Sequence, residues 1–201
     1  MKYNFDEILN RENTASVKYD LRLEIFENKE VIPMWVADMD FKTPDFIISA
    51  IKERLNHEVF GYSFRPKSYY ESIVKWLKRR HNWDIKVDWI SFSPCVVPAL
   101  NMAIKAYTKP GDKIIIQPPV YFPFFSAIQN NNRELVENPL KLKGKRYCVD
   151  FNDLEEKLKD SKMIILSNPH NPGGSVWTKD ELKKIGNLCI KNNVLIMSDE
   201  I

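Results

Sequence analysis

The sequence Ile-Ile-Leu-Ser-Asn-Pro-His-Asn-Pro-Gly-Gly, at residues 164–174, indicates the fold of this chain. Its three leading apolar residues are typical of a buried strand, and the Asn-Pro pairs and glycines after them are typical of a rigid turn. A helical pattern at residues 150–160 precedes the strand, and another covers residues 178–193, where Thr178 and Glu181 have the spacing of a capping box. Helices on either side of a strand are typical of a parallel sheet.

The same alternation extends along the chain on both sides of this stretch. Short apolar runs at residues 114–116 and 194–197 indicate two more strands, and residues 99–109 have a helical pattern. Because strands and helices alternate, we expect an α/β fold with a mainly parallel sheet and helices on both faces.

The N-terminal part has a different pattern. Residues 1–45 are irregular, with charged residues among single apolar ones, and we expect an arm or a segment of a small domain. Helices are predicted at about residues 46–57, with one apolar face, and 66–81. We place the large domain at residues 46–201. We expect it to be incomplete at its C-terminus, because the chain ends four residues after the last buried strand.

The composition excludes several classes of protein. The 201 residues include 30 Lys+Arg and 27 Asp+Glu, a formal net charge of +3, and 44% of them are hydrophobic. Basic residues spread among acidic ones argue against a nucleic-acid partner, and no apolar run approaches the roughly 20 residues that cross a bilayer. Residues 1–13 have no apolar core and are not a secretory signal. We expect a soluble, cytoplasmic protein with no membrane partner.

The cysteines and histidines do not predict a metal site. Three widely spaced cysteines and three isolated histidines have neither the spacing of a disulfide framework nor that of metal ligands. We therefore expect reduced thiols and no metal. These residues are Cys95, Cys148 and Cys189, and His57, His81 and His170.

Three groups of residues follow predicted strands, where ligand sites gather in parallel α/β folds. Residues 93–100 lead into a helix whose first N–H groups suit an anion such as phosphate, although an ordinary strand-to-helix turn has the same pattern and no Gly-rich nucleotide motif is present. The turn at residues 167–174 favours a side-chain amide directed at a ligand over simple loop punctuation. Asp199 closes the last strand, where a carboxylate is costly unless it has a cationic partner or is solvated.

Together these residues resemble a known family, the fold-type-I pyridoxal-phosphate (PLP) enzymes of the aminotransferase class I/II superfamily. The resemblance is to the cystathionine β-lyase-like branch, and it extends from about residue 14 to the end of the chain. Five ordered motifs carry it. They are Met34-Trp35-Val36-Ala37-Asp38-Met39-Asp40-Phe41, Val59-Phe60-Gly61-Tyr62-Ser63, Pro118-Pro119-Val120-Tyr121, Asn168 to Gly174, and Ser198-Asp199-Glu200-Ile201.

The resemblance implies roles around the ring of PLP for three residues. Asp199 would pair with the pyridinium nitrogen and keep it protonated, so that the ring can act as an electron sink. Asn171 would donate its amide to the phenolate oxygen of the ring. Tyr121 would stack on the ring face, although a core tyrosine after a strand has the same pattern.

The resemblance also implies a phosphate site and a partner. Cys95, Val96 and Val97 would present their backbone N–H groups to the cofactor phosphate. Tyr62 would reach this phosphate with its hydroxyl from the partner subunit, which implies a homodimer with shared active sites.

Two residues depart from the family pattern, and the family's Schiff-base lysine and carboxylate-binding arginine are both missing. Cys95 stands where the family often has glycine, and Tyr19 stands where the branch usually has tryptophan in a Lys-Trp-Asp motif. In this family the lysine that forms a Schiff base with PLP lies beyond the aspartate strand, and this chain ends before it. The resemblance therefore implies the N-terminal portion of a longer enzyme, inactive and poorly soluble by itself.

For the complete protein, the resemblance implies a PLP-dependent carbon–sulfur β-lyase. It would convert L-cystathionine or a similar cysteine S-conjugate to a thiol, pyruvate and ammonia. A PLP-dependent amino-acid aminotransferase is the alternative, because it uses the same electron sink. A non-catalytic regulatory module is a further alternative, which is disfavoured because the sequence has no helix-turn-helix pattern with a basic recognition helix.

Overall fold

The computed structural model describes residues 3–200, so Ile201 of the last motif lies outside the described residues. The chain divides into two compact units, Met1–Lys67 and Ser68–Ile201, which are described separately below. The domain boundary that the sequence suggests, between residues 45 and 46, remains a prediction.

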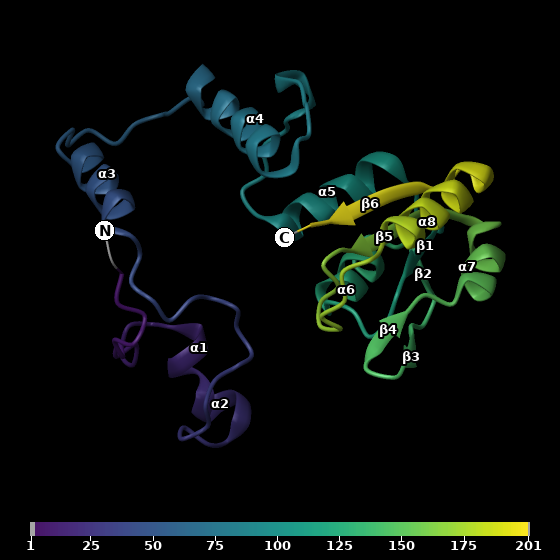
Figure 1. The fold of residues 1–201 in the computed structure, drawn as a ribbon, viewed down its shortest axis with the longest axis horizontal. Coiled ribbons are helices and arrows are strands. Elements are labelled where there is room, and N and C mark those ends of the chain that lie inside the picture. The colour runs from purple at the N-terminus through teal and green to yellow at the C-terminus, as the bar shows by residue number, and fades with distance from the viewer. Residues whose placement is uncertain (1–2, 201) are drawn as a thin grey trace. The chain divides into compact units, whose positions relative to one another are not determined.

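The second unit contains the predicted parallel sheet. Its four strands lie in the order β2-β1-β5-β6, and each neighbouring pair is parallel. The strands are β1 (Lys113–Ile116), β2 (Glu134–Glu137), β5 (Ser161–Ser167) and β6 (Leu195–Asp199). The sequence predicted β1, β5 and β6, and the structure confirms the α/β class (Figure 1).

Two helices cover each face of this sheet. On one face are α5 (Val96–Tyr107) and α6 (Pro123–Gln129), and on the other are α7 (Phe151–Leu158) and α8 (Lys179–Asn192). Successive side chains of a strand point to opposite faces. Ile114 and Ile116 therefore pack with α5 and α6, whereas Ile115 packs with α7 and α8. All three isoleucines are fully buried, as in a sheet covered on both sides.

The two edges of the sheet differ in character. At one edge, β2 begins with Glu134 and ends with Glu137, and both glutamates are exposed. At the other edge, β6 begins with Leu195, Ile196 and Met197, and Leu195 is 44% exposed. Charged side chains protect an edge strand from pairing with another strand, and apolar ones do not.

A short antiparallel hairpin accompanies the sheet. It consists of β3 (Lys141–Lys143) and β4 (Arg146–Cys148), which the sequence patterns did not predict. Arg146 of this hairpin donates two hydrogen bonds to the Glu181 carboxylate in the first turn of α8, at 2.8 and 2.7 Å. The hairpin is thereby fastened to α8.

The predicted capping box at the start of α8 is confirmed. The Thr178 hydroxyl accepts from the Glu181 N–H at 3.2 Å, and the Glu181 carboxylate accepts from the Thr178 N–H at 2.8 Å. The hydrogen bonds from Arg146, and then those from Thr178, lower the pKa of Glu181 to about 2. Glu181 therefore stays ionised and stabilises both the helix end and the hairpin.

We expect Glu181→Ala to reduce the free energy of unfolding by about 1–2 kcal/mol, because it removes a helix cap and an ion pair together. Since the pKa of Glu181 is lowered in the folded state, its stabilisation is complete above pH 4.5, the ordinary value, and is lost as the pH falls towards 2. Urea unfolding of both proteins between pH 7 and pH 3 measures this. Glu181→Gln keeps a capping side chain and should show a smaller loss; equal stability of wild type and Glu181→Ala at pH 7 would contradict the prediction.

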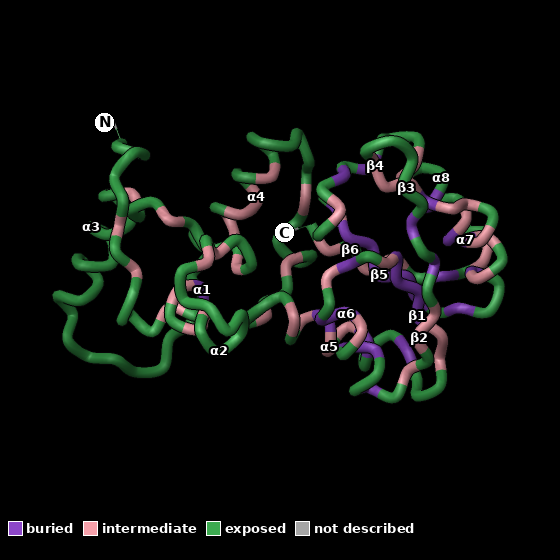
Figure 2. The backbone as a smooth tube through the Cα atoms, turned by 90° about the horizontal axis from the view of Figure 1, so that it is seen from below, coloured by how far each residue is buried: buried purple, intermediate pink, exposed green. Residues whose placement is uncertain are grey.

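The first unit contains little buried surface. Its helices are α1 (Val17–Asp20), α2 (Arg22–Phe26) and α3 (Asp45–Leu55), and α4 (Lys67–His81) begins where the unit ends. Among the described residues 3–67, only Lys18 is buried (Figure 2). The apolar residues predicted on one face of α3 are at least 38% exposed. They are Ile47, Ile48, Ile51 and Leu55.

The expectation of an irregular segment at residues 1–45 is wrong where α1 and α2 occur. The Asp20 carboxylate accepts hydrogen bonds from the backbone N–H groups of Asn13, Thr14 and Ser16, at 2.8, 3.1 and 2.9 Å. These bonds fix the turn before α1 and lower the pKa of Asp20. Helices of four and five residues are too short to show a hydrophobic periodicity, so the sequence pattern missed them.

Candidate functional site

A pocket of about 400 Å³ lies between the first half of α5 and the end of β6. Its walls combine small and apolar side chains with the polar residues that close β6. The lining residues are Val96, Ala99, Leu100, Ala103, Met197, Ser198, Asp199 and Glu200. Two of the predicted site residues, Val96 and Asp199, therefore line one pocket although they are distant in the sequence.

The start of α5 gives one side of this pocket a positive character. The first N–H groups of a helix have no partner within the helix, and the helix dipole is positive at this end. Cys95 is the N-cap residue of α5, and its side chain makes no capping hydrogen bond. Cys95, Val96 and Val97 are the N-cap and the first two residues of α5, and the predicted contact of their backbone with an anion remains a prediction.

Only the backbone of Cys95 has a structural role in this turn. Its carbonyl accepts hydrogen bonds from the Ser93 hydroxyl at 2.8 Å and from the Ala99 N–H at 3.2 Å, and its side chain is exposed. A glycine at this position, as the related family often has, would leave these bonds in place.

Asp199 lines the pocket from β6. This residue ends β6 and lies directly beside Ser167, the last residue of β5. The Asn168 N–H donates to the Asp199 carbonyl at 2.9 Å, which ties the loop after β5 to the end of β6. The positive end of α5 and a carboxylate thus share one pocket.

Asn171 lies in the loop that follows β5. Its backbone N–H donates to the Ser167 hydroxyl at 3.1 Å, and its side chain is exposed. Two bonds from Trp177 hold the base of this loop: Trp177 N–H donates to Asn168 Oδ1 at 3.1 Å, and its indole N–H donates to the Ser167 carbonyl at 2.9 Å. The loop is a fixed structure, as its Asn-Pro pairs indicated.

Tyr121 lies in the loop between β1 and α6. Its ring is half-buried and meets the ring of Phe124 edge to face, with the centroids 5.9 Å apart and the planes at 87°. The Phe122 ring lies 5.5 Å away. Neither Tyr121 nor Asn171 lines the pocket, so their predicted contacts with a ring remain predictions.

His170 connects these two loops, and the sequence reasoning missed this connection. Its Nε2 lies 2.7 Å from the Pro119 carbonyl, two residues before Tyr121, and His170 itself directly precedes Asn171. The only signal in the sequence was its position between two Asn-Pro pairs. This histidine therefore links the loop that carries Tyr121 to the loop that carries Asn171.

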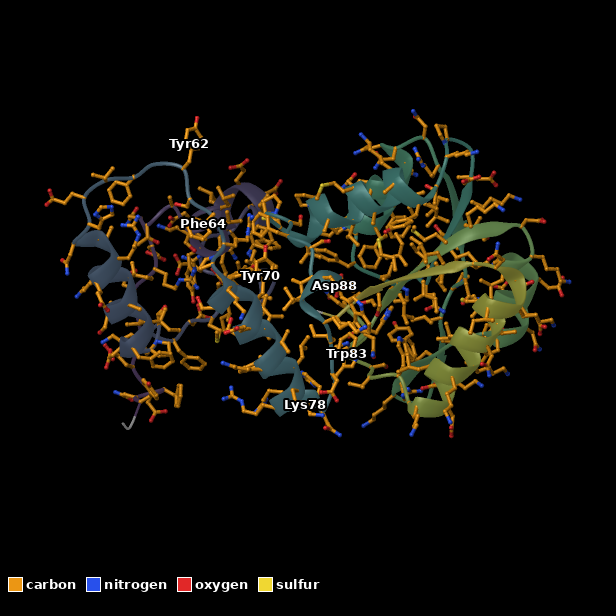
Figure 3. The ribbon with its side chains drawn as sticks, turned by 90° about the horizontal axis from the view of Figure 1, so that it is seen from above. Tyr62, Phe64, Tyr70, Lys78, Trp83 and Asp88 are labelled. Atoms are coloured by element: carbon orange, nitrogen blue, oxygen red, sulfur yellow. The ribbon has the colours of Figure 1, made fainter. Side chains whose placement is uncertain are left out.

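Tyr62 belongs to the first unit, in the segment between α3 and α4. Its side chain is fully exposed and points away from the chain (Figure 3). Phe60 and Phe64 on the same segment are 71% and 84% exposed. The predicted contact of Tyr62 with a phosphate remains a prediction.

A cluster of ion pairs holds the Met34–Phe41 motif in place within the first unit. Arg11 contacts Asp38 at 2.5 Å and Asp40 at 2.8 Å, and the buried Lys18 ammonium contacts Asp40 at 2.7 Å. The Tyr19 hydroxyl donates to Asp40 at 3.1 Å. Lys18 first, and then Arg11, lower the pKa of Asp40 to about 2. Two separate motifs of the sequence, at residues 18–20 and 34–41, therefore make direct contact.

Within residues 3–200, no group of three or more His, Cys, Asp and Glu side chains could hold a metal ion. The same residues form no helix that is long and apolar enough to cross a membrane.

The sequence profile of aminotransferase class I and II matches residues 29–201. The chain therefore belongs to the aminotransferase class I and II family. Its second unit, a parallel sheet with helices on both faces, has the α/β fold of the fold-type-I enzymes.

Three similar proteins represent the relatives. Cystathionine beta-lyase PatB of Bacillus subtilis is 46% identical over 98% of this chain and 52% of its own length. A PLP-bound structure from Clostridium difficile 630, described as an aminotransferase, is 54% identical with a TM-score of 0.96. The PLP-bound C-S lyase of Staphylococcus hominis is 37% identical with a TM-score of 0.92. Each of these two structural matches covers 100% of this chain and 52% of the matched chain. The chain thus spans about half the length of these relatives.

Proposed function

We propose that this chain is the N-terminal portion of a PLP-dependent C–S β-lyase. One observation carries the proposal: the positive end of α5 and the Asp199 carboxylate share a pocket of about 400 Å³. Such a pocket suits a small ligand with an anionic group at one end and a protonated nitrogen at the other. PLP has these two features in its phosphate and its pyridine nitrogen. The PLP-bound relatives and the relative that is a cystathionine beta-lyase support the proposal.

Three side chains would hold the ring. Asp199 would accept a hydrogen bond from the pyridine N–H and keep that proton in place. Asn171 would donate its amide to the ring oxygen, and Tyr121 would cover one face of the ring. When bound, PLP supplies an electron sink for the charge left by removal of the substrate α-proton.

The backbone N–H groups of Cys95, Val96 and Val97 would bind the phosphate. Tyr62 would add its hydroxyl from the partner subunit of a homodimer. The exposed aromatic side chains of Phe60, Tyr62 and Phe64 support a partner, because a cluster of exposed apolar surface is typical of an interaction site. The free thiols of Cys95, Cys148 and Cys189 support a reducing, cytoplasmic location.

The substrate we propose is L-cystathionine or a similar cysteine S-conjugate. With one water molecule it would give a thiol, pyruvate and ammonia. The base for the α-proton is the lysine that the family resemblance places beyond residue 201. We therefore assign the reaction to the longer protein, in which this chain would supply the cofactor pocket.

An aminotransferase is the second candidate, because the matching family is named aminotransferase class I and II and the similar structure from Clostridium difficile 630 is described as an aminotransferase. The test is to express the reading frame that continues past Ile201 and to measure pyruvate released from L-cystathionine without any keto acid. Pyruvate with equimolar thiol supports the lyase, and amino transfer that depends on an added keto acid supports the aminotransferase. The 201-residue chain is the matched control and should release no pyruvate.

A further inference from the structure

The side chain of His170 is buried and bound on one side only. It is 2% exposed, and its Nε2 lies 2.7 Å from the Pro119 carbonyl oxygen. A carbonyl only accepts, so Nε2 carries the hydrogen and donates it. Nδ1 has no hydrogen-bond partner among the described residues.

The surrounding residues fix the direction of this bond. The Trp177 ring lies 5.4 Å from the imidazole, at 58°. A Cβ at Gly173 would lie 2.8 Å from His170 Cδ2 and 3.1 Å from Tyr147 Cδ2, so only glycine leaves room for the imidazole here. The His170 backbone is equally fixed, because its N–H donates to Ser175 and its carbonyl accepts from Gly174, both at 2.7 Å.

The bond joins two loops that leave adjacent strands, β1 and β5. Pro119 lies two residues before Tyr121, and His170 lies directly before Asn171. We propose that His170 is a positioning residue: its hydrogen bond to Pro119 sets the position of Tyr121 relative to Asn171, and so the placement of the cofactor ring between them. This inference rests on the proposed function, which gives Tyr121 and Asn171 their ring contacts.

The test compares variants of the longer protein with PLP bound. His170→Phe keeps a ring but removes the donor, His170→Asn has an amide too short to reach Pro119, and His170→Gln places an amide nitrogen near the position of Nε2. We expect His170→Phe and His170→Asn to lower kcat about tenfold to a hundredfold, since misplacement by about an ångström has effects of this size. We also expect them to shift the pH midpoint of the visible absorption band of bound PLP. His170→Gln should have a kcat and an absorption midpoint close to the wild-type values.

Glu181→Gln is the control for a general loss of stability, because Glu181 contacts neither loop residue in question. It should leave kcat and the absorption midpoint unchanged. Wild-type values in both His170→Phe and His170→Asn, or equal defects in His170→Gln, would overturn the positioning role. If the wild-type protein binds no PLP, the proposed function itself is wrong. If the wild-type protein binds PLP and is active, and the variants do not differ from it, only the positioning role of His170 is wrong.

Discussion

Asp199→Asn should lower kcat for pyruvate release from L-cystathionine by about a hundredfold to a thousandfold in the longer protein. Asparagine has the size of aspartate but no charge, so it cannot hold a proton on the pyridine nitrogen. Loss of a fixed group that stabilises developing charge has effects of this magnitude. The backbone bond from Asn168 to the Asp199 carbonyl does not depend on the side chain, so the loop after β5 should stay in place.

Steady-state kinetics at saturating PLP measure this effect, with circular dichroism to compare the folded state. Ser198→Ala is a matched control in the same pocket wall, because it changes a neighbouring side chain without removing a charge. It should stay close to wild type. A kcat for Asp199→Asn within threefold of wild type would remove Asp199 from the proposed mechanism.

Val97→Pro should weaken PLP binding about tenfold to a hundredfold, whereas Val97→Ala should change it less than threefold. Proline removes one backbone N–H from the start of α5, and a hydrogen bond to a charged group is worth about 1.5–3 kcal/mol. Proline is tolerated in the first turn of a helix, and Pro98 already occupies this turn. The two variants therefore separate the backbone of Val97 from its side chain.

Titration of the apoenzyme with PLP, followed by protein fluorescence, gives the two dissociation constants. Far-UV circular dichroism shows whether α5 remains folded. Equal binding by Val97→Pro and wild type would exclude the start of α5 as the phosphate site. Equal weakening in both variants would assign the effect to the side chain instead.

The layers of the second unit could be predicted because their signal is local. Runs such as Ile114 to Ile116 and Ile164 to Leu166 are apolar at every position, which only a strand buried on both faces requires. The start of α8 could also be predicted from the sequence, because a capping box needs only two residues that are three positions apart. Short elements such as α6 and β2 lack enough residues to show a period, and they were missed.

The sequence indicated candidate residues for the site, but it could not indicate which of them lie together. Val96 and Asp199 line one pocket because the sheet order places β6 beside β5 and α5 packs over it, and no local pattern reports that order. The bond between His170 and Pro119 joins residues 51 positions apart. The ion pair of Lys18 with Asp40 also joins residues that are distant in the sequence. Each depends on the completed fold, whereas the family resemblance identified the residues one by one.

The contrast between the two sheet edges gives the fold a direction of extension. A strand added beside β2 would meet the charged side chains of Glu134 and Glu137, whereas a strand added beside β6 would meet Leu195 and Ile196. Further backbone can therefore join the sheet at β6 far more readily than at β2.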